Sequence, residues 1–114
     1  MRYALLIHDN PANWGEISED EQQAITAEYM QLSSDDRVVG GARLQPPDMT
    51  TTVRSNGNGE ALLTDGPFVT AKEFLGGFFL LDAENLDEAT AFAARIPAAR
   101  SGGAVEVRAI DLES

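Results

Sequence analysis

The chain has 114 residues, no cysteine, and 19 acidic against 8 basic residues, which gives a formal net charge of −11. This length suits one domain, residues 1–114, and the missing cysteines exclude a disulfide framework, thiol catalysis and cysteine-based metal sites. Because so acidic a chain with scattered bases would repel phosphate groups, we expect no nucleic-acid and no membrane partner. Neither a membrane-length apolar run nor a secretory leader stands out, which favours a cytoplasmic location.

The first half of the chain predicts a strand, a helix and a second strand. Residues 2–8 form the first strand, whose odd-numbered and even-numbered residues are both largely apolar. Ser18 and Glu21 have the spacing of a capping box, which begins a helix over residues 19–32. Residues 38–44 form the second strand; its paired glycines, Gly40 and Gly41, indicate a bulge or a close backbone approach.

The second half predicts a hairpin, a buried strand, a helix and a closing strand. Residues 50–54 and 60–64 flank an Asn-Gly-Asn-Gly turn, a strong hairpin signal. Residues 76–82 form a strand that is apolar on both faces, and residues 105–110 form the last strand. Between them, Asn85 begins a helix that Pro97 ends, and the spacing predicts a buried stripe of Leu86, Ala89, Ala93 and Ile96.

This order, β-α-β, a β-hairpin, then β-α-β, predicts an α+β fold, a ferredoxin-like sandwich with both helices on one sheet face. The first and fifth strands are apolar on both faces, chiefly through Phe78, Phe79, Leu80 and Leu81. Since a large apolar face is rarely left in water, we expect a homodimer whose two sheets pack face to face. An obligate interface of this kind buries upwards of roughly 2,000 Å².

Two residues are the candidates for acid–base chemistry. His8, the only histidine, ends the first strand beside Asp9; it is either a general base oriented by a carboxylate or a partly buried side chain at the core edge. Asp65 begins a sharp Asp-Gly-Pro turn, and we expect its carboxylate to accept a backbone N–H within the next few residues. The alternative is that this turn projects Asp65 and Phe68 into a pocket beside the sheet.

Other side chains are candidate ligand-binding groups. Arg43 and Arg108 on strands either grip a ligand carboxylate or extend from the sheet edge to solvent. Lys72 is the only lysine; it either binds a ligand or forms a solvated pair with Glu73. Trp14 either covers a pocket or caps the core. No spacing of His, Asp and Glu matches a metal site, and no glycine loop precedes a helix, so we expect neither metal nor cofactor.

Three central motifs stand out: TDGPF at residues 64–68, Lys-Glu at 72–73 and LGGF at 75–78. In these motifs, and in its opening and closing strands, the chain resembles the YCII-related family in its DGPF-domain branch. This resemblance implies a ferredoxin-like homodimer of the dimeric α/β-barrel type. A few YCII-type proteins are enzymes, including a dehydrochlorinase of chlorinated hydroxyquinol breakdown, for which a His–Asp pair is the proposed catalytic feature. Those members carry their histidine on the first helix, where this chain has none. DGPF members tend to be encoded beside extracytoplasmic-function sigma factors.

Together these observations give two hypotheses. The first is a protein that binds a small molecule near the Asp65 turn, with metal-independent, lyase-like chemistry carried by His8 and Asp65 in one cavity. In it, Asp65 orients His8, which removes a proton next to a carbonyl or a phenol. Trp14, Arg43, Phe68, Lys72 and Arg108 would contact the ligand. The second is a non-catalytic regulatory or ligand-sensing partner of a sigma factor.

Overall fold

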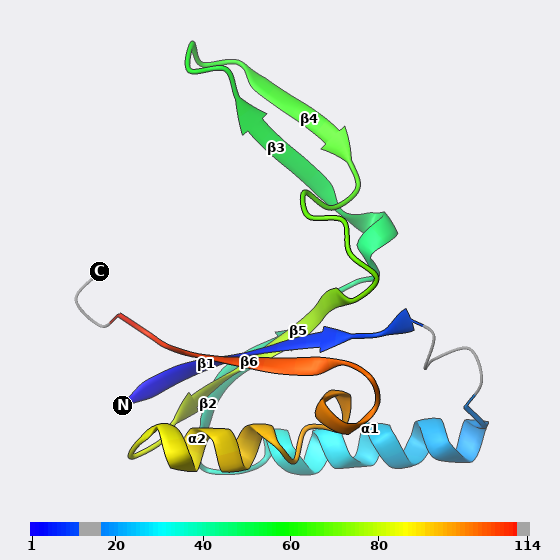
Figure 1. The fold of residues 1–114 in the computed structure, drawn as a ribbon, viewed down its shortest axis with the longest axis vertical. Helices are drawn as coiled ribbons and strands as arrows, with labels where there is room; N and C mark the ends of the chain where they lie inside the picture. Colours follow the sequence, from blue (N-terminus) through cyan, green and yellow to red (C-terminus); the bar gives the residue numbers. More distant parts are fainter. Residues whose placement is uncertain (12–16, 112–114) are drawn as a thin grey trace.

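The computed structural model describes residues 1–11 and 17–111 of the chain (Figure 1). Its larger elements, in chain order, are β1 (Arg2–Asp9), α1 (Glu19–Ser33), β2 (Val38–Arg43), β3 (Thr51–Ser55), β4 (Ala61–Asp65), β5 (Phe74–Asp82), α2 (Leu86–Ala93) and β6 (Ala104–Ala109). Two short 3₁₀ helices, η2 (Pro47–Met49) and η3 (Pro97–Arg100), follow the ends of β2 and α2.

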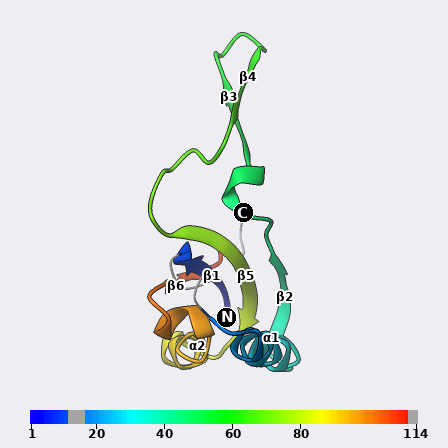
Figure 2. The same cartoon turned by 90° about the vertical axis from the view of Figure 1, so that its right-hand side faces the viewer.

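Four strands form one antiparallel sheet in the order β2-β5-β1-β6, with β1 and β5 at its centre. Both helices cover the same side of this sheet, as Figures 1 and 2 agree. The fold is therefore α+β and consistent with the ferredoxin-like plan that the sequence predicts. The remaining strands, β3 and β4, pair only with each other and form a separate two-stranded sheet inserted between β2 and β5.

Local sequence signals fix where the helices begin. Ser18 caps α1, because its hydroxyl accepts the backbone N–H of Glu21 at 3.1 Å, and Asn85 caps α2 in the same way through Glu88 at 2.9 Å. Three acidic residues in the first turn of α1 favour the positive end of its dipole. Both helix starts were predicted from the sequence and are confirmed.

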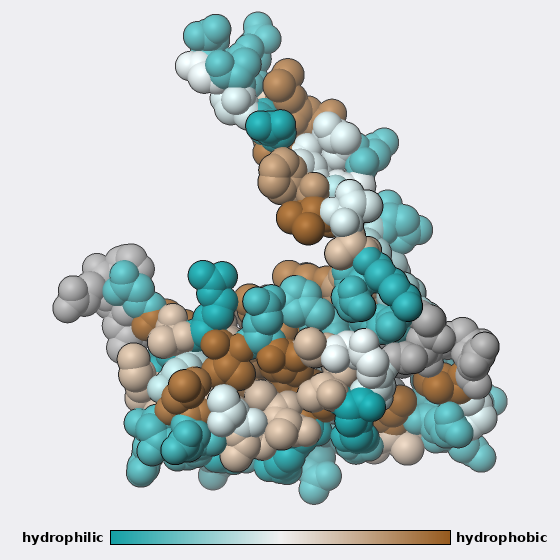
Figure 3. All heavy atoms as spheres, in the orientation of Figure 1, coloured by the Kyte–Doolittle hydropathy of each residue, from teal (hydrophilic) through white to brown (hydrophobic). Residues whose placement is uncertain are grey.

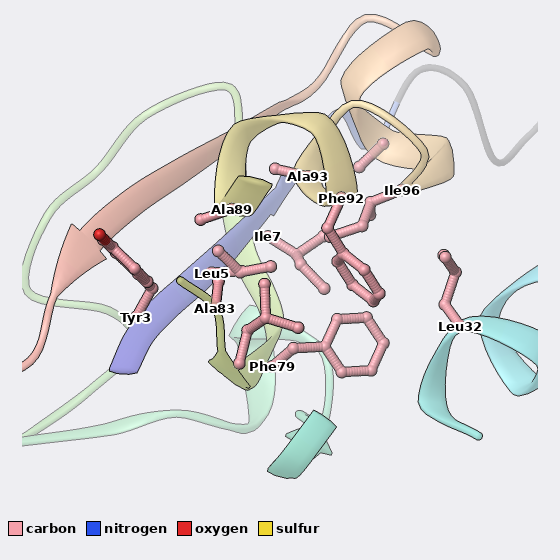
Figure 4. Close-up of a cluster of buried hydrophobic side chains, with 12 residues drawn as sticks. Tyr3, Leu5, Ile7, Leu32, Phe79, Ala83, Ala89, Phe92, Ala93 and Ile96 are labelled. Carbon is pink, nitrogen blue, oxygen red and sulfur yellow. The ribbon is translucent and has the colours of Figure 1, made fainter. Parts of the chain in front are cut away.

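The hydrophobic core lies between the sheet and the helices (Figure 4). Phe92 of α2 meets Phe79 of β5 edge to face, with ring centroids 6.2 Å apart. Such a pair adds to the stabilisation that burial alone provides. The core consists of Tyr3, Leu5, Ile7, Leu32, Phe79, Leu81, Ala83, Ala89, Phe92, Ala93, Ile96 and Ala98.

One member of the predicted stripe on α2 was wrong. Leu86 is 54% exposed, and Phe92, which the spacing did not single out, is buried instead. The helix also ends at Ala93 rather than before Pro97, because the N–H groups of Arg95 and Ile96 turn to carbonyls three residues back. This tightening from α-helical to 3₁₀ geometry rotates the next residues and carries Ile96 into the core.

The opposite side of the sheet carries no helix, and we call it the open face. In β1 and β5, fully buried residues alternate with half-buried ones, as the two-sided apolar pattern predicts. The register places Leu6 opposite Phe78 and Ala4 opposite Leu80, so these four side chains share the open face. All four are partly accessible.

Arg37 ties the two helices to the edge of the sheet. Its guanidinium bonds Asp35, just after α1, and Glu88 of α2, at 2.9–3.0 Å, and lies 5.4 Å from the centre of the Phe92 ring. The hydrogen bonds from Arg37 lower the pKa of Asp35 to about 2. Three separate segments of chain therefore converge on one side chain.

Candidate functional site

The end of β1 brings an imidazole next to a carboxylate on the open face. His8 lies opposite Ala104 of β6, and Glu106 lies opposite Leu6, so the two are diagonal neighbours on one face. The Nε2 atom of His8 lies 2.5 Å from Oε1 of Glu106. This nitrogen is shielded from solvent, and no group of residues 1–11 or 17–111 meets it in hydrogen-bond geometry, Glu106 included. Glu106 therefore lies directly against this nitrogen without forming a well-aligned hydrogen bond.

The next residue of β1, Asp9, projects to the helix-covered side. Burial raises the pKa of the Asp9 carboxyl, and the positive charges of Arg43 and His8 offset part of this increase. Arg43 is the last residue of β2, opposite Gly77 of β5, and is exposed. A carboxylate that is destabilised by burial and faces a guanidinium is a group suited to proton transfer or to orienting a ligand.

Tyr29 of α1 lies within electrostatic range of Asp9. Burial is the main reason that the pKa of Tyr29 is raised to about 12, and the negative charge of Asp9 raises it further. A hydrogen bond with the backbone of Ala98 and the charges of Arg100 and Arg43 act in the opposite direction. The phenol therefore stays protonated at neutral pH and can donate a hydrogen bond at this end of the sheet.

A glycine makes room for the Asp9 carboxylate. The pairing of β1 with β5 shifts by one residue between Ile7 and His8, so Gly76 forms a bulge in β5. A Cβ atom at Gly76 would overlap the Oδ2 atom of Asp9. A side chain at position 76 would displace the Asp9 carboxylate from β5, so this glycine helps to position Asp9.

Comparison with known proteins places the chain in a family. The family model of the YCII-related domain matches residues 1–112, almost the whole sequence. The chain belongs to the YCII-related family. It is also similar to uncharacterized protein R00369 of Rhizobium meliloti (strain 1021), with 34% identity over 120 residues that cover 98% of this chain and 94% of that protein.

Two of the predicted site residues of this YCII-related protein lie within electrostatic range of Asp9. His8 and Arg43 come from different strands and opposite faces of the sheet, and both charges act on Asp9. Arg108 lies on the open face opposite Ala4, one step along that face from Glu106, and is exposed. Trp14 lies outside the described residues.

The remaining predicted residues lie in or beside the hairpin. Phe68 and Lys72 follow β4 and are exposed, and the guanidinium of Arg54 lies 5.7 Å from the centre of the Phe68 ring. Asp65 ends β4, in a different sheet from His8. No hydrogen bond or ion pair joins Asp65 to His8 in the described part of this YCII-related chain.

The predicted hydrogen bond of Asp65 was wrong. Its carboxylate accepts none from the residues that the structure describes. The turn is held instead by Gly66, whose N–H donates to the carbonyl of Thr50 at 2.7 Å and whose carbonyl accepts the hydroxyl of Thr52 at 2.6 Å. Gly66 has φ = 103°, a backbone conformation that favours glycine. Thr52 of β3 and Thr50, the residue before this strand, thus supply the bonds that we assigned to the aspartate, and the Asp65 side chain is left exposed.

Sequence reasoning missed Glu106, Tyr29 and the role of Gly76. Glu106 alternates with apolar residues in β6, which marks it as facing away from the core. That pattern could have indicated a partner for His8, but only once the register of β6 against β1 was known. Tyr29 packs against the core as a partly buried residue.

No three His, Asp or Glu side chains among residues 1–11 and 17–111 lie together in a way that could hold a metal ion. Within the same ranges, no helix is both long and apolar enough to cross a membrane.

Proposed function

We propose that residues 1–114 act as one unit that binds a small anionic molecule at the end of β1 and transfers a proton to or from it through His8. The observation that carries this proposal is the approach of Glu106 to a shielded imidazole nitrogen that makes no aligned hydrogen bond. A histidine held against a carboxylate can act as a base near neutral pH. Arg108, exposed on the open face beside Glu106, supplies a guanidinium for a ligand carboxylate or phenolate.

The reaction class follows from these groups. His8 removes a proton from a carbon next to a carbonyl, or from a phenol, and the electron pair moves onto the oxygen. Arg108, which shares the open face with His8 and Glu106, then stabilises the negative oxygen by a hydrogen bond. If the adjacent carbon bears a leaving group such as chloride, the electron pair expels it as chloride ion and His8 passes its proton to water. This is the lyase-like, metal-independent chemistry that the family resemblance implies.

The sequence hypothesis named Asp65 as the acid–base partner of His8, and we revise this assignment. Within one chain, Glu106 and Asp9 are the carboxylates beside His8, whereas Asp65 lies in the other sheet. We therefore assign the orienting role to Glu106 and keep Asp65 as a candidate supplied from outside the chain. Arg43, Phe68 and Lys72 remain candidate ligand contacts.

Deuterium exchange tests the proposal without a known substrate. A panel of 2-oxo acids and substituted phenols is incubated with the protein in D₂O, and the loss of carbon-bound protons is followed by NMR. We expect exchange of at least one compound, a loss of at least tenfold in His8→Gln, and a smaller loss in Glu106→Gln. Glu84→Gln, the same change at an exposed glutamate, serves as the control and should match the parent.

The same experiment distinguishes the proposed proton transfer from the non-catalytic alternative. A non-catalytic regulatory partner of a sigma factor would show no exchange with any compound, and His8→Gln would behave like the parent. Exchange that survives His8→Gln would also overturn the proposed mechanism, because proton transfer would then run through another group.

A further inference from the structure

The β3–β4 hairpin and the turn after it repeat one dipeptide pattern three times. An asparagine or aspartate precedes a glycine at positions 56–57, 58–59 and 65–66. In this pattern the backbone nitrogen of the glycine can attack the side-chain carbonyl carbon of the residue before it, because no Cβ atom hinders the approach. The two Asn-Gly pairs are identical in sequence, so any difference in their reactivity must come from the fold.

Crowding does not distinguish the three glycines. Gly57, Gly59 and Gly66 have φ angles of 87°, 86° and 103°, and a Cβ atom placed on any of them would meet nothing within 4 Å. Figure 3 shows the tip of the hairpin as a polar projection that stands clear of the body of the molecule. Every residue from 55 to 60 is exposed. The hydrogen bonds of the glycine nitrogens are what differ.

Only one of the three glycine nitrogens is free in the described part of the chain. The N–H of Gly57 donates to the hydroxyl of Ser55 at 3.2 Å, and the N–H of Gly66 donates to the carbonyl of Thr50 at 2.7 Å. The N–H of Gly59 donates to no group of the described residues. A nitrogen that donates must give up its hydrogen bond before it can lose its proton and attack, so the fold protects two of the sites.

The side chains of the two asparagines differ in the same direction. Oδ1 of Asn56 accepts the N–H of Asn58 at 2.8 Å, and Nδ2 of Asn56 donates to the carboxylate of Glu60 at 3.2 Å. The side chain of Asn58 is exposed and makes no hydrogen bond with any residue that the structure describes. Asn58 can therefore turn towards the nitrogen of Gly59 without breaking a bond, whereas Asn56 cannot turn towards Gly57.

We propose that Asn58 is a site of spontaneous modification, at which the side-chain amide is lost and the residue becomes aspartate or isoaspartate. The nitrogen of Gly59 gives its proton to hydroxide and forms a bond to Cγ of Asn58. The bond from Cγ to the amide nitrogen breaks, and this nitrogen takes a proton from water and leaves as ammonia. Water then opens the five-membered imide ring at one carbonyl to give aspartate, or at the other to give isoaspartate, in which the backbone runs through the side chain.

Either product changes the tip of the hairpin. Each adds one negative charge to a chain whose formal net charge is already −11. Isoaspartate also adds a methylene group to the backbone between Asn56 and Glu60, whose N–H···O bond of 3.3 Å closes the loop. Because β3 and β4 pair only with each other, and a two-stranded sheet is marginally stable on its own, the longer loop should loosen their pairing.

Peptide mapping of the aged protein tests the site. After incubation of the full chain at mildly alkaline pH, trypsin cleaves at Arg54 and Lys72, and the peptide of residues 55–72 carries all three pairs. Fragmentation in a mass spectrometer then gives the rate at each position. We expect Asn58 to convert at least fivefold faster than Asn56, the factor by which one ordinary hydrogen bond slows a reaction that must first break it. Equal rates, a faster Asn56, or an Asn58 that does not convert would overturn the proposal.

Two controls identify the hydrogen bonds as the cause. In concentrated urea the two asparagines should convert at similar rates, and a preference for Asn58 that persisted there would show that the fold does not set the order. Ser55→Ala, at an exposed position, removes the acceptor of the Gly57 N–H. It should accelerate conversion of Asn56 and leave Asn58 unchanged. An Asn56 that Ser55→Ala does not accelerate would contradict the protective role of this hydrogen bond.

The variant Asn58→Asp separates the effect of charge from that of the longer backbone. It carries the new charge but no additional methylene group. In hydrogen–deuterium exchange, the isoaspartyl fraction of the aged protein should exchange the backbone amides of β4 faster than Asn58→Asp does. Equal exchange in the two proteins would refute the effect on strand pairing.

Discussion

Phe92 provides a quantitative test of how the helices are fastened to the sheet. Its ring is 1% exposed, packs edge to face on Phe79, and lies under the guanidinium groups of Arg37 and Arg95 at 5.4 and 5.7 Å. Phe92→Ala removes the ring and leaves a cavity, which costs about 3–5 kcal/mol at buried phenylalanines. Because the aromatic pair and both cation–π contacts are lost as well, we place the cost at the upper end, about 4–5 kcal/mol.

This loss is large beside the total stability of the chain. At about 0.05–0.15 kcal/mol per residue, the free energy of unfolding is roughly 6–17 kcal/mol. Urea unfolding, followed by circular dichroism at one fixed protein concentration, measures the change. We expect Phe92→Ala to lower the urea concentration at the unfolding midpoint and to leave unchanged the slope of the unfolding free energy against urea concentration. Leu86→Ala, at the exposed position of the same helix, is the control and should cost less than about 0.5 kcal/mol.

A cost below about 2 kcal/mol for Phe92→Ala would refute this reasoning. It would mean that the ring can be lost without leaving a cavity, and hence that α2 does not pack on β5 as Figure 4 shows. Phe92→Leu distinguishes burial from ring-specific contacts, since it retains most of the volume and removes only the aromatic interactions.

Three further predictions concern single side chains. Asp35→Asn should make the protein less stable at neutral pH by less than about 1 kcal/mol, since the ion pair of Asp35 with Arg37 is partly exposed. Arg37 lowers the pKa of Asp35 from 3.8 to about 2. In acid unfolding, the parent should therefore be more stable than the variant above pH 4 and lose this advantage as the pH falls through 2. Asp9→Asn should gain stability relative to the parent as the pH rises through the raised pKa of Asp9, because a half-buried charge is removed. An equal difference in urea midpoint between variant and parent at pH 3 and at pH 7 would contradict this expectation. Thr52→Val should cost about 1 kcal/mol of stability by removing the hydroxyl that donates to the Gly66 carbonyl. Asp65→Ala should leave the urea midpoint unchanged. If Asp65→Ala lowered the midpoint and Thr52→Val did not, the turn role first assigned to Asp65 would be restored.

The sequence predicted those parts of the fold that depend on near neighbours. The caps at Ser18 and Asn85 act over three residues, and the alternation in β1 needs only its own side chains, so both could be recognised. The contact of His8 with Glu106 depends on the register of two strands that lie far apart in the chain, and no local pattern contains it. The turn at Gly66 was misassigned for the same reason, since its bonds come from Thr50 and Thr52, which lie across the hairpin.

The helix α2 shows a different limit. Helical spacing predicted Leu86 as part of the buried stripe, yet Leu86 is exposed and Phe92 is buried. Spacing fixes which residues share a face but not how the helix is rotated about its axis. Here the rotation depends on the edge-to-face contact of Phe92 with Phe79, which belongs to another element.

The position of β1 has a consequence for biosynthesis. β1 is the first strand to be made, yet both of its neighbours, β5 and β6, lie in the second half of the chain. The growing polypeptide therefore carries an unpaired apolar strand until most of its length has left the ribosome. Pairings between such distant segments form slowly, because long loops must close before any contact offsets their entropy. During that interval the apolar side chains of β1 are a natural binding site for a chaperone, and newly made chains should be more prone to aggregate than the folded protein.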